Sequence, residues 1–393
     1  MQKHLSNQIT VATHTNHCVM CGTFAPSPYK YHPFFPSERM CAARDECQIT
    51  KCTACQRFEP GIGSGREEFS DLQDNDRKLC PACLRTVIVD SQDAIPLWSS
   101  VVDFLDIQLG VFFTSLDAAA ATAAVAFNNN NDNACGVGGK SNGGNLEAIK
   151  FQMKSIPILI VNHEGLNDPY VKGSGHGQGN TRGLCMHEHR QLPTFLARGK
   201  KESVGGGRLK DFLDSKRKQS SSTSAFQTIL TSFANTATSS IQQHLRSSRI
   251  TAILCLKGLP RDLVSSILAH EATHAWFKLH PSFDPIVPIP LKVEEGCCQL
   301  VAFIYLSHLE EHYNIIGNGD DDDGNHGKSN YCKNDQPSNL KLCQYFRHCI
   351  ETDASEIYGD GFRLAAEAYS KCNSVATVLE HVVAHKCFPS FSL

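Results

Sequence analysis

The chain has 393 residues, of which 41% are hydrophobic and 20% are charged, and its formal net charge is −3. This composition is typical of a folded globular protein, and the length allows two or three domains. Because nucleic acids and anionic membranes attract strongly basic chains, the near-neutral charge argues against both partners. No stretch approaches eighteen consecutive apolar residues, so we expect no transmembrane helix.

Eighteen cysteines are many for a chain whose first residues lack the apolar core of a secretion signal. In a reducing compartment such cysteines ligate metals or remain free thiols rather than form disulfides. We therefore expect a cytoplasmic or nuclear protein. Several cysteines, including Cys255, Cys297 and Cys298, lie in apolar stretches, where a thiol packs as a small hydrophobic side chain.

Residues 15–90 contain three Cys-x-x-Cys pairs and are predicted to form a small LIM-like module. A Cys-x-x-Cys turn presents two thiolates to one tetrahedral zinc ion, and two such turns complete a structural site. One predicted site consists of Cys52, Cys55, Cys80 and Cys83. The segment has few long apolar runs, so the metal is expected to supply much of its folding free energy.

A second structural zinc site is predicted closer to the N-terminus. Its ligands are expected to be Cys18, Cys21, His32 and Cys41, with Asp45 or Cys47 as substitutes for one of them. The spacing of these residues is less regular than in the first site, so both substitutes stay open.

Residues 91–393 are predicted to form a second, larger domain. Apolar residues recur at helical spacing over 95–113, and a low-complexity insertion near 115–145 is too rich in Ala, Asn and Gly to order itself. The apolar runs 156–161 and 250–256 are predicted to be buried strands. Pro260 then suits the first turn of a helix, where its missing N–H costs little.

The segment from Ser265 to Phe277 contains His-Glu-x-x-His at positions 270–274. On a helix His270 and His274 lie one turn apart on the same face and can bind one metal ion. Glu271 can then act as general base on a water, as in zinc peptidases. The alternative is a buried helix with two hydrogen-bonded histidines.

A second helix begins near Val293 and carries Glu294 and Glu295, about twenty residues after His274. Glutamate-type zinc peptidases supply their third metal ligand at this distance. One acidic residue here is also explained by the helix dipole, but the dipole does not explain the preceding histidine pair. Glu295 is favoured as the ligand because Glu-Gly resembles the corresponding helix of related aminopeptidases, and Glu294 remains open.

The C-terminal part begins with a second low-complexity insertion near 316–335, followed by predicted helices at 340–353 and 361–384. Tyr358 to Gly361 is predicted to be a turn whose glycines permit positive φ. Tyr358 is a candidate donor to an oxyanion, and Asp360 a candidate to orient a metal-binding histidine.

Three segments together resemble one known family. They are Leu268–Trp276 with His-Glu-x-x-His, Val293–Gln299 with Glu-Glu-Gly-x-Cys-Gln, and Ile357–Arg363 with Tyr-Gly-Asp-Gly-Phe-Arg. Shorter matches occur at Asp76–Cys80 and Thr181–Cys185. The chain resembles the plant LIM-domain peptidases of the DA-one-like family, which are ubiquitin-activated zinc proteases that limit organ size. The similarity covers most of residues 15–390.

This resemblance implies a zinc-dependent endopeptidase that acts on protein substrates in ubiquitin-linked growth regulation, with ubiquitin or a ubiquitin ligase as partner. We find no counterpart of the family's first LIM domain or of its acidic ubiquitin-interacting helix in the sequence. We therefore expect the chain to lack both features. Ubiquitin activation thus rests on the resemblance alone.

In sum, the sequence predicts an α+β protein in which a gluzincin-like zinc peptidase domain follows a two-zinc LIM-like module. One catalytic zinc would be held by His270, His274 and Glu295, with Glu271 and Tyr358 as catalytic residues. The alternative is a zinc-stapled adaptor that binds ubiquitin-pathway partners without cleaving them, although an adaptor has no physical need for Glu271.

Overall fold

The computed structural model describes residues 17–24, 29–41, 49–61, 64, 66–112, 143–167, 181–189, 248–317 and 336–389. Most of the two predicted insertions, near 115–145 and 316–335, lies outside the described residues. The first was predicted too long, because helix α4 (Gly143–Lys154) already begins at its end.

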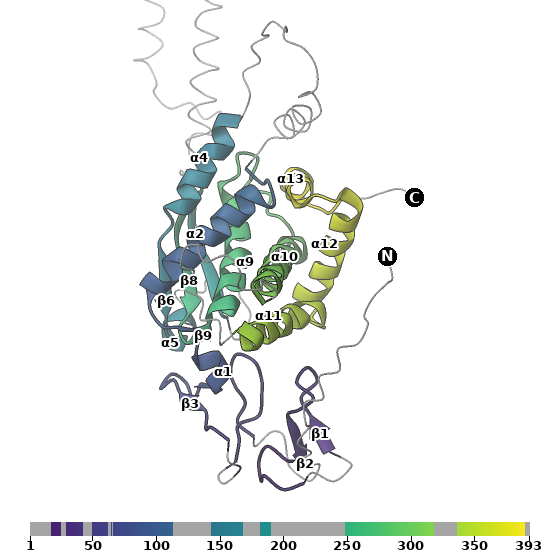
Figure 1. The fold of residues 1–393 in the computed structure, drawn as a ribbon. Helices are drawn as coiled ribbons and strands as arrows, with labels where there is room; N and C mark the ends of the chain where they lie inside the picture. The colour runs from purple at the N-terminus through teal and green to yellow at the C-terminus, as the bar shows by residue number, and fades with distance from the viewer. Residues whose placement is uncertain are drawn as a thin grey trace, which may run out of the picture.

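The N-terminal module consists of short elements below the main body of the molecule (Figure 1). Strand β1 (Tyr29–Tyr31) pairs antiparallel with β2 (Arg39–Cys41), and β3 (Ser70–Asp71) pairs antiparallel with β4 (Lys78–Leu79), before the single-turn helix α1 (Pro81–Leu84). Hairpins this short are marginal on their own in water. Their order therefore depends on the cysteine clusters that they carry.

The body contains a three-stranded mixed sheet in the order β6-β8-β7. Strand β8 (Ser248–Leu256) is central, with β6 (Ile158–Val161) parallel to it and β7 (Gly183–His189) antiparallel. Both edges of β8 are paired, as the prediction of a buried strand requires, and β7 is an edge strand of this sheet.

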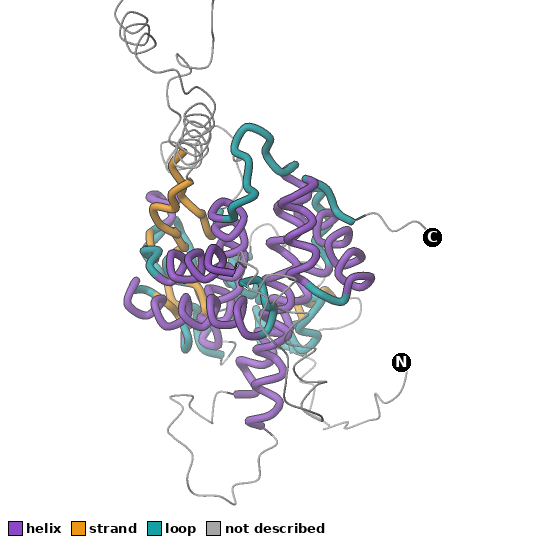
Figure 2. The backbone as a smooth tube through the Cα atoms, turned by 90° about the horizontal axis from the view of Figure 1, so that it is seen from above, coloured by secondary structure: helices purple, strands orange, loops and turns teal. Residues whose placement is uncertain are grey.

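Helix α9 (Arg261–Leu279) lies between the sheet and the helices that follow it in the chain (Figure 1), and Figure 2 shows most of the strands gathered at one side of the body. Its large side chains, among them Leu268, Trp276 and Phe277, are almost completely buried, so contacts on all sides fix its position. The other helices are α2 (Ser91–Ile107), α5 (His163–Asn167), α10 (Leu291–Gly317), α11 (Gln336–Glu351), α12 (Tyr358–Cys372) and α13 (Val375–His385). No described helix combines the length and apolar character that a bilayer crossing requires.

Helix α2 begins four residues earlier than the apolar spacing predicted, because the side chain of Asp90 accepts a hydrogen bond from Gln92 N and caps it. The helix ends at Ile107, and Gly110 follows with φ of 64°. The cap at Asp90 therefore explains why the helix begins before residue 95, where the apolar periodicity begins.

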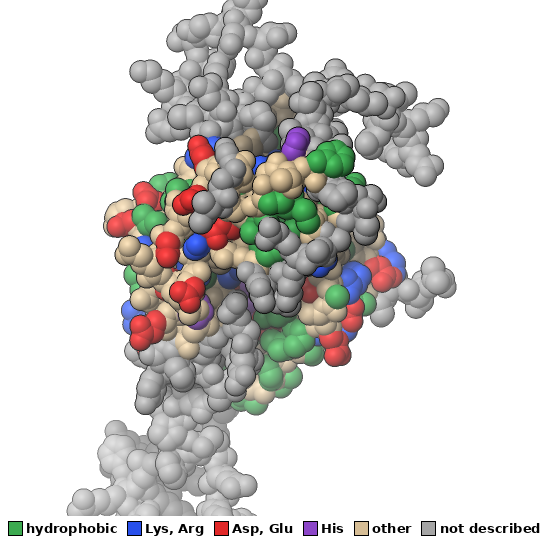
Figure 3. Space-filling view, turned by 90° about the horizontal axis from the view of Figure 1, so that it is seen from below, with side chains coloured by type: hydrophobic (Ala, Val, Ile, Leu, Met, Phe, Trp, Pro, Cys, Tyr) green, Lys and Arg blue, Asp and Glu red, His purple; other side chains and the backbone are tan. Residues whose placement is uncertain are grey.

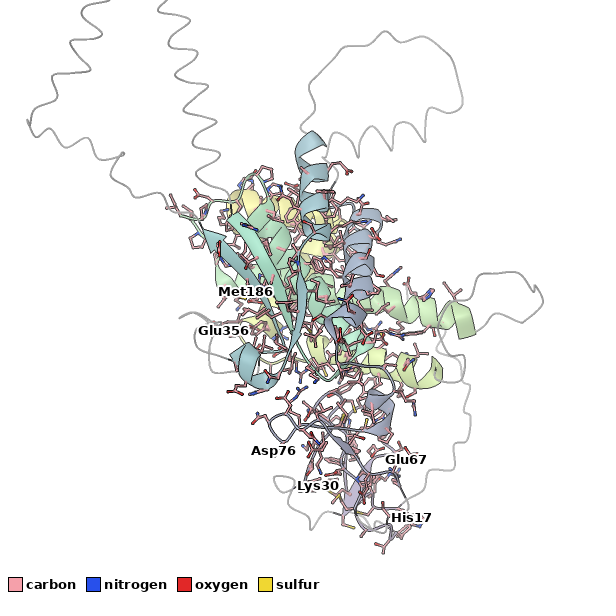
Figure 4. The ribbon with its side chains drawn as sticks, turned by 90° about the vertical axis from the view of Figure 1, so that its left-hand side faces the viewer. His17, Lys30, Glu67, Asp76, Met186 and Glu356 are labelled. Carbon is pink, nitrogen blue, oxygen red and sulfur yellow. The ribbon has the colours of Figure 1, made fainter. Side chains whose placement is uncertain are left out.

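The module and the body share one hydrophobic core. Strand β5 (Val87–Ile88) pairs with β9 (Leu259–Pro260), which leads directly into α9. The guanidinium of Arg77 donates to the carbonyl oxygen of Lys257 at 2.8 Å. In Figure 4, Asp76 lies on the half of the module nearer the body, whereas His17 marks its far tip.

His32 lies in an aromatic cluster at this junction rather than among the cysteines. Its Nδ1 accepts hydrogen bonds from the backbone N–H groups of Phe34 and Phe35, each at 3.1 Å. Its ring lies 5.6 Å from that of Tyr345 on α11. Burial holds the pKa of His32 down at about 4, so the neutral ring is the form that fits.

Two glycines allow α10 and α12 to cross in close contact. A Cβ atom on Gly296 would lie 2.4 Å from the carbonyl oxygen of Gly361. Residues 358–361 are therefore the first turn of a helix, and the prediction of a turn with positive φ is wrong. The predicted helix 361–384 is in fact two helices, which Asn373 separates with φ of 52°.

We predict that Gly296→Ala destabilises the protein. Alanine usually stabilises a helix interior relative to glycine by up to about 1 kcal/mol, whereas the clash with Gly361 should reverse the sign and cost about 2 kcal/mol or more. Urea denaturation measures the difference. Gly165→Ala is the matched control, since its nearest contact is a side-chain oxygen at 3.0 Å, and a similar loss there would contradict the explanation.

We also predict a pH dependence of stability from His32. Its pKa of about 4 in the folded protein lies below the ordinary 6.5, so the unfolded state binds the proton more readily. Stability should be fully present above pH 6.5 and decline by up to roughly 3 kcal/mol as the pH falls to about 4.

His32→Asn retains an acceptor for the two backbone N–H groups but cannot titrate in this range. The free energy of unfolding of both proteins, measured from pH 7 to pH 4, separates this effect from protonation of the cysteines, which the two proteins share. If the free energy of unfolding falls equally in both proteins as the pH decreases, His32 is not the cause of the pH dependence.

Candidate metal and catalytic site

Helix α9 presents its three motif residues side by side, because their spacing is that of one helical turn. The rings of His270 and His274 have centroids 5.0 Å apart. Glu271 is 6% exposed. The helix begins after Pro260 with Asp262 in its first turn, where a negative charge complements the helix dipole.

Glu295 of α10 meets both imidazoles at one carboxylate oxygen. Its Oε2 lies 3.0 Å from His270 Nε2 and 3.5 Å from His274 Nε2, is buried and has no hydrogen-bond partner. Burial alone would raise the pKa of Glu295, but the two imidazoles hold it well below its usual range. A buried, ionised oxygen facing two ring nitrogens fits a cation held between them.

Glu294 has a different position. Its Oε1 lies 2.7 Å from His274 Nδ1 and also accepts from Lys278 Nζ at 2.7 Å. Burial opposes ionisation, yet these contacts hold the pKa of Glu294 at about 2. The carboxylate thus faces the ring nitrogen opposite to the one that faces Glu295, which is how a supporting residue orients a metal-binding histidine.

Asp360 does not take that supporting place. Its carboxylate is nearly half exposed and pairs with Lys292 at 3.4 Å and with Arg363. The suggestion that Asp360 orients a histidine is therefore wrong. The residue that contacts His274 comes from α10 instead, one position before Glu295.

Cys298 is a neighbour of the site that the sequence interpretation missed. Its Sγ lies within 4.8 Å of ligand atoms of His270 and His274. Burial raises the pKa of this thiol to about 12, which favours the protonated form. Cys298 follows Glu294 by four residues and Glu295 by three, so helical spacing could have placed it on their face.

Gly183 brings strand β7 against the His-Glu-x-x-His motif. A Cβ atom at this position would lie 2.4 Å from Ile267 Cγ2 and 2.6 Å from Glu271 Oε1. Only glycine permits this approach, so the edge strand runs directly beside the Glu271 carboxylate. A peptide paired with that edge would therefore pass the motif.

A cleft of about 870 Å³ opens over these groups, lined by residues of β7, α9, α10, α11, α12 and the module. Tyr358 lines it, and burial raises the pKa of Tyr358 to about 12. Figure 4 shows β7, marked by Met186, and the loop before α12, marked by Glu356, on the same side of the body. In Figure 3 acidic and basic side chains are interspersed over the coloured surface.

The structural cysteines form two groups. Cys52, Cys55, Cys80 and Cys83 are buried together, and Cys55 Sγ lies 3.5 Å from Cys80 Sγ, a separation too long for a disulfide. Cys18, Cys21 and Cys41 form the second group. Both have the thiol chemistry of zinc sites.

The structure does not bring His32 to the second group, whose thiols lie together without it, because the His32 ring packs against Tyr345 of α11 instead. The two proposed substitutes, Asp45 and Cys47, lie outside the described residues.

Comparison with known proteins finds plant relatives with DA1-related or LIM-domain names. The chain is 27% identical to Protein DA1-related 1 of Arabidopsis thaliana over 391 residues, covering 96% of this chain and 56% of the relative. It is 28% identical to Protein DA1-related 2 of the same plant, covering 95% and 58%. It is 27% identical to LIM domain-containing protein HDR3 of Oryza sativa subsp. japonica, covering 91% and 59%.

The chain thus spans a little over half the length of these curated relatives. No solved structure matches it. The family model DA1-like, described as Protein DA1, matches residues 148–385. Because that match covers more than half of its residues, the chain belongs to the DA1-like family.

Proposed function

We propose that this protein is a zinc-dependent endopeptidase whose catalytic metal is held by His270, His274 and Glu295. The observation that carries the proposal is the buried Oε2 of Glu295, which has no hydrogen-bond partner and faces the Nε2 atoms of both histidines. Two imidazoles and one carboxylate are the protein ligands of a catalytic zinc site that keeps one position open.

Zinc bound there would supply Lewis acidity to a water and to the scissile carbonyl. Glu271, beside the β7 edge, takes the proton of the attacking water and passes it to the leaving amine. Tyr358 lines the same cleft, and in the proposal its hydroxyl donates to the developing oxyanion. Glu294 holds His274 in the orientation that directs Nε2 toward Glu295.

In the proposed gluzincin-like arrangement β7 positions the substrate. Among the described strands, only β8 pairs with β7, and the closeness of Gly183 to Glu271 would place a peptide on the other edge of β7 within reach of the general base. Protein substrates follow from the length of this edge. Two further zinc ions would be structural, one in each cysteine group.

Resemblance to the family extends the proposal to ubiquitin-linked growth regulation, with ubiquitin or a ubiquitin ligase as partner. The adaptor alternative does not account for Glu271, since a protein that only binds has no need for a carboxylate beside the metal.

We predict that the purified protein contains three zinc equivalents, and that the double variant His270→Ala with His274→Ala loses one of them. Metal analysis of both proteins checks this. Only two zinc equivalents in the parent protein would favour the adaptor.

We predict that Glu295→Gln and Glu294→Gln weaken zinc binding to different extents. Removing a ligand should lower the affinity by several orders of magnitude, whereas removing the support of His274 should lower it about 10- to 100-fold. Competition with a zinc-binding dye measures both. A larger loss in Glu294→Gln would reverse the two assignments.

We predict that Glu271→Gln retains all zinc and loses cleavage of a protein substrate by at least about 10²-fold, because the amide cannot take the proton. Metal analysis and a cleavage assay on the same preparation check this. Glu164→Gln, at an exposed position on α5, is the matched control. Cleavage at the parent rate in Glu271→Gln would show that this residue is not the base.

A further inference from the structure

Arg182 lies at the end of the cleft where the module meets the body. It precedes Gly183, the residue that contacts Glu271, and its side chain lines the cleft. Its backbone carbonyl accepts a hydrogen bond from Leu256 N at 2.9 Å, which anchors this position to the central strand. The backbone of Arg182 is therefore one residue away from the position at which β7 contacts Glu271.

The zinc knuckle between Cys52 and Cys55 holds the guanidinium. Arg182 Nη2 donates to the carbonyl oxygen of Thr53 at 3.5 Å. Ala54 of the knuckle and Gln56, which directly follows Cys55, line the same cleft. The structural zinc module is thus part of the cleft wall rather than a separate appendage.

Helix α11 lines the same cleft as Arg182. Burial raises the pKa of Tyr345 and of Cys349, and the Arg182 charge acts against that rise at both groups. Both side chains line the cleft. Arg182 thus places a positive charge in a cleft that both the knuckle and α11 line.

No described carboxylate pairs with this charge. Other cations near the site do have acidic partners, Lys278 with Glu294 at 2.7 Å and Arg77 with Asp74 at 2.9 Å. Asp353 lines the cleft as well, but its Oδ1 accepts from Ser355 N, and no ion pair joins it to Arg182 among the residues that the structure describes. A guanidinium has five N–H donors in a planar fork, and Thr53 uses only one.

We propose that Arg182 binds the carboxylate of an aspartate or glutamate in the peptide substrate, and that the zinc knuckle holds Arg182 for this purpose. This inference rests on the proposed peptidase function. The recognised residue lies about one or two positions from the scissile bond, since Arg182 adjoins Gly183 and each residue of an extended peptide advances roughly 3.3 Å. The fork of the guanidinium matches a carboxylate geometrically.

Arg182→Gln tests the proposal with zinc-loaded full-length protein. The substrates are mixed peptide libraries of fixed length in which glutamate, glutamine or lysine is fixed at one position at a time. The parent should prefer glutamate over glutamine at one or two positions by about tenfold, as expected for one charge-assisted contact. In Arg182→Gln this ratio should fall to about one, and in Arg182→Glu lysine should become preferred.

Arg85→Gln is the matched control. Arg85 also joins the module to the body, through Nη2 to Ser338 Oγ at 3.0 Å, but does not line the cleft. The control should keep the glutamate preference. A purely structural Arg182 would lower turnover of all libraries equally and leave the ratio unchanged, which would overturn the proposal.

Binding of the same libraries to Glu271→Gln, measured by fluorescence anisotropy, separates this inference from the proposed function. If Glu271→Gln binds glutamate peptides through Arg182 but the parent protein cleaves none of them, the Arg182 site is supported and the proposed peptidase function is refuted. A parent that cleaves without any Arg182-dependent preference would refute only the site.

Discussion

The rest of the site depends on the contact between the buried carboxylate of Glu295 and the imidazoles of His270 and His274. An ionised oxygen without a hydrogen bond is costly in a protein interior unless positive charge faces it, and the two Nε2 atoms of His270 and His274 define where that charge must be. The two histidines come from α9 and the carboxylate from α10, so their convergence depends on how these two helices pack. Glu294, one residue away, then sets the orientation of His274 through the opposite ring nitrogen.

Close backbone contacts make this convergence possible. Gly296 and Gly361 let α12 approach α10, which brings Tyr358 to the cleft, and Gly183 lets β7 approach α9 beside Glu271. At these crossings a methyl group would occupy the space of another backbone or of the Glu271 carboxylate. The glycines in Glu-Glu-Gly and Tyr-Gly-Asp-Gly therefore serve helix packing rather than turn formation.

Much of the site could be predicted from the sequence because its ligands are local. The helical spacing of His270 and His274 and the four cysteines of the Cys-x-x-Cys pairs are patterns within one or two elements. Strand β7 was missed because its seven residues combine small, sulfur-containing and polar side chains without regular alternation. Glu294 and Glu295 could not be separated by sequence, since their roles depend on the direction from which α10 approaches. His32 was predicted as a zinc ligand, but its ring packs beside Phe35 of the module and Tyr345 of α11, and the second of these contacts depends on a helix more than 300 residues further along the chain.

The pairing of β5 with β9 bears on the order in which the chain can fold. The module is synthesised first and can bind its metal early, but Arg77 and its acceptor Lys257 are 180 residues apart. Docking of the module thus waits until the strand before α9 has left the ribosome, and such long-range contacts form slowly. A chain that stops before β9 would therefore leave exposed the apolar surface that the module buries against the body.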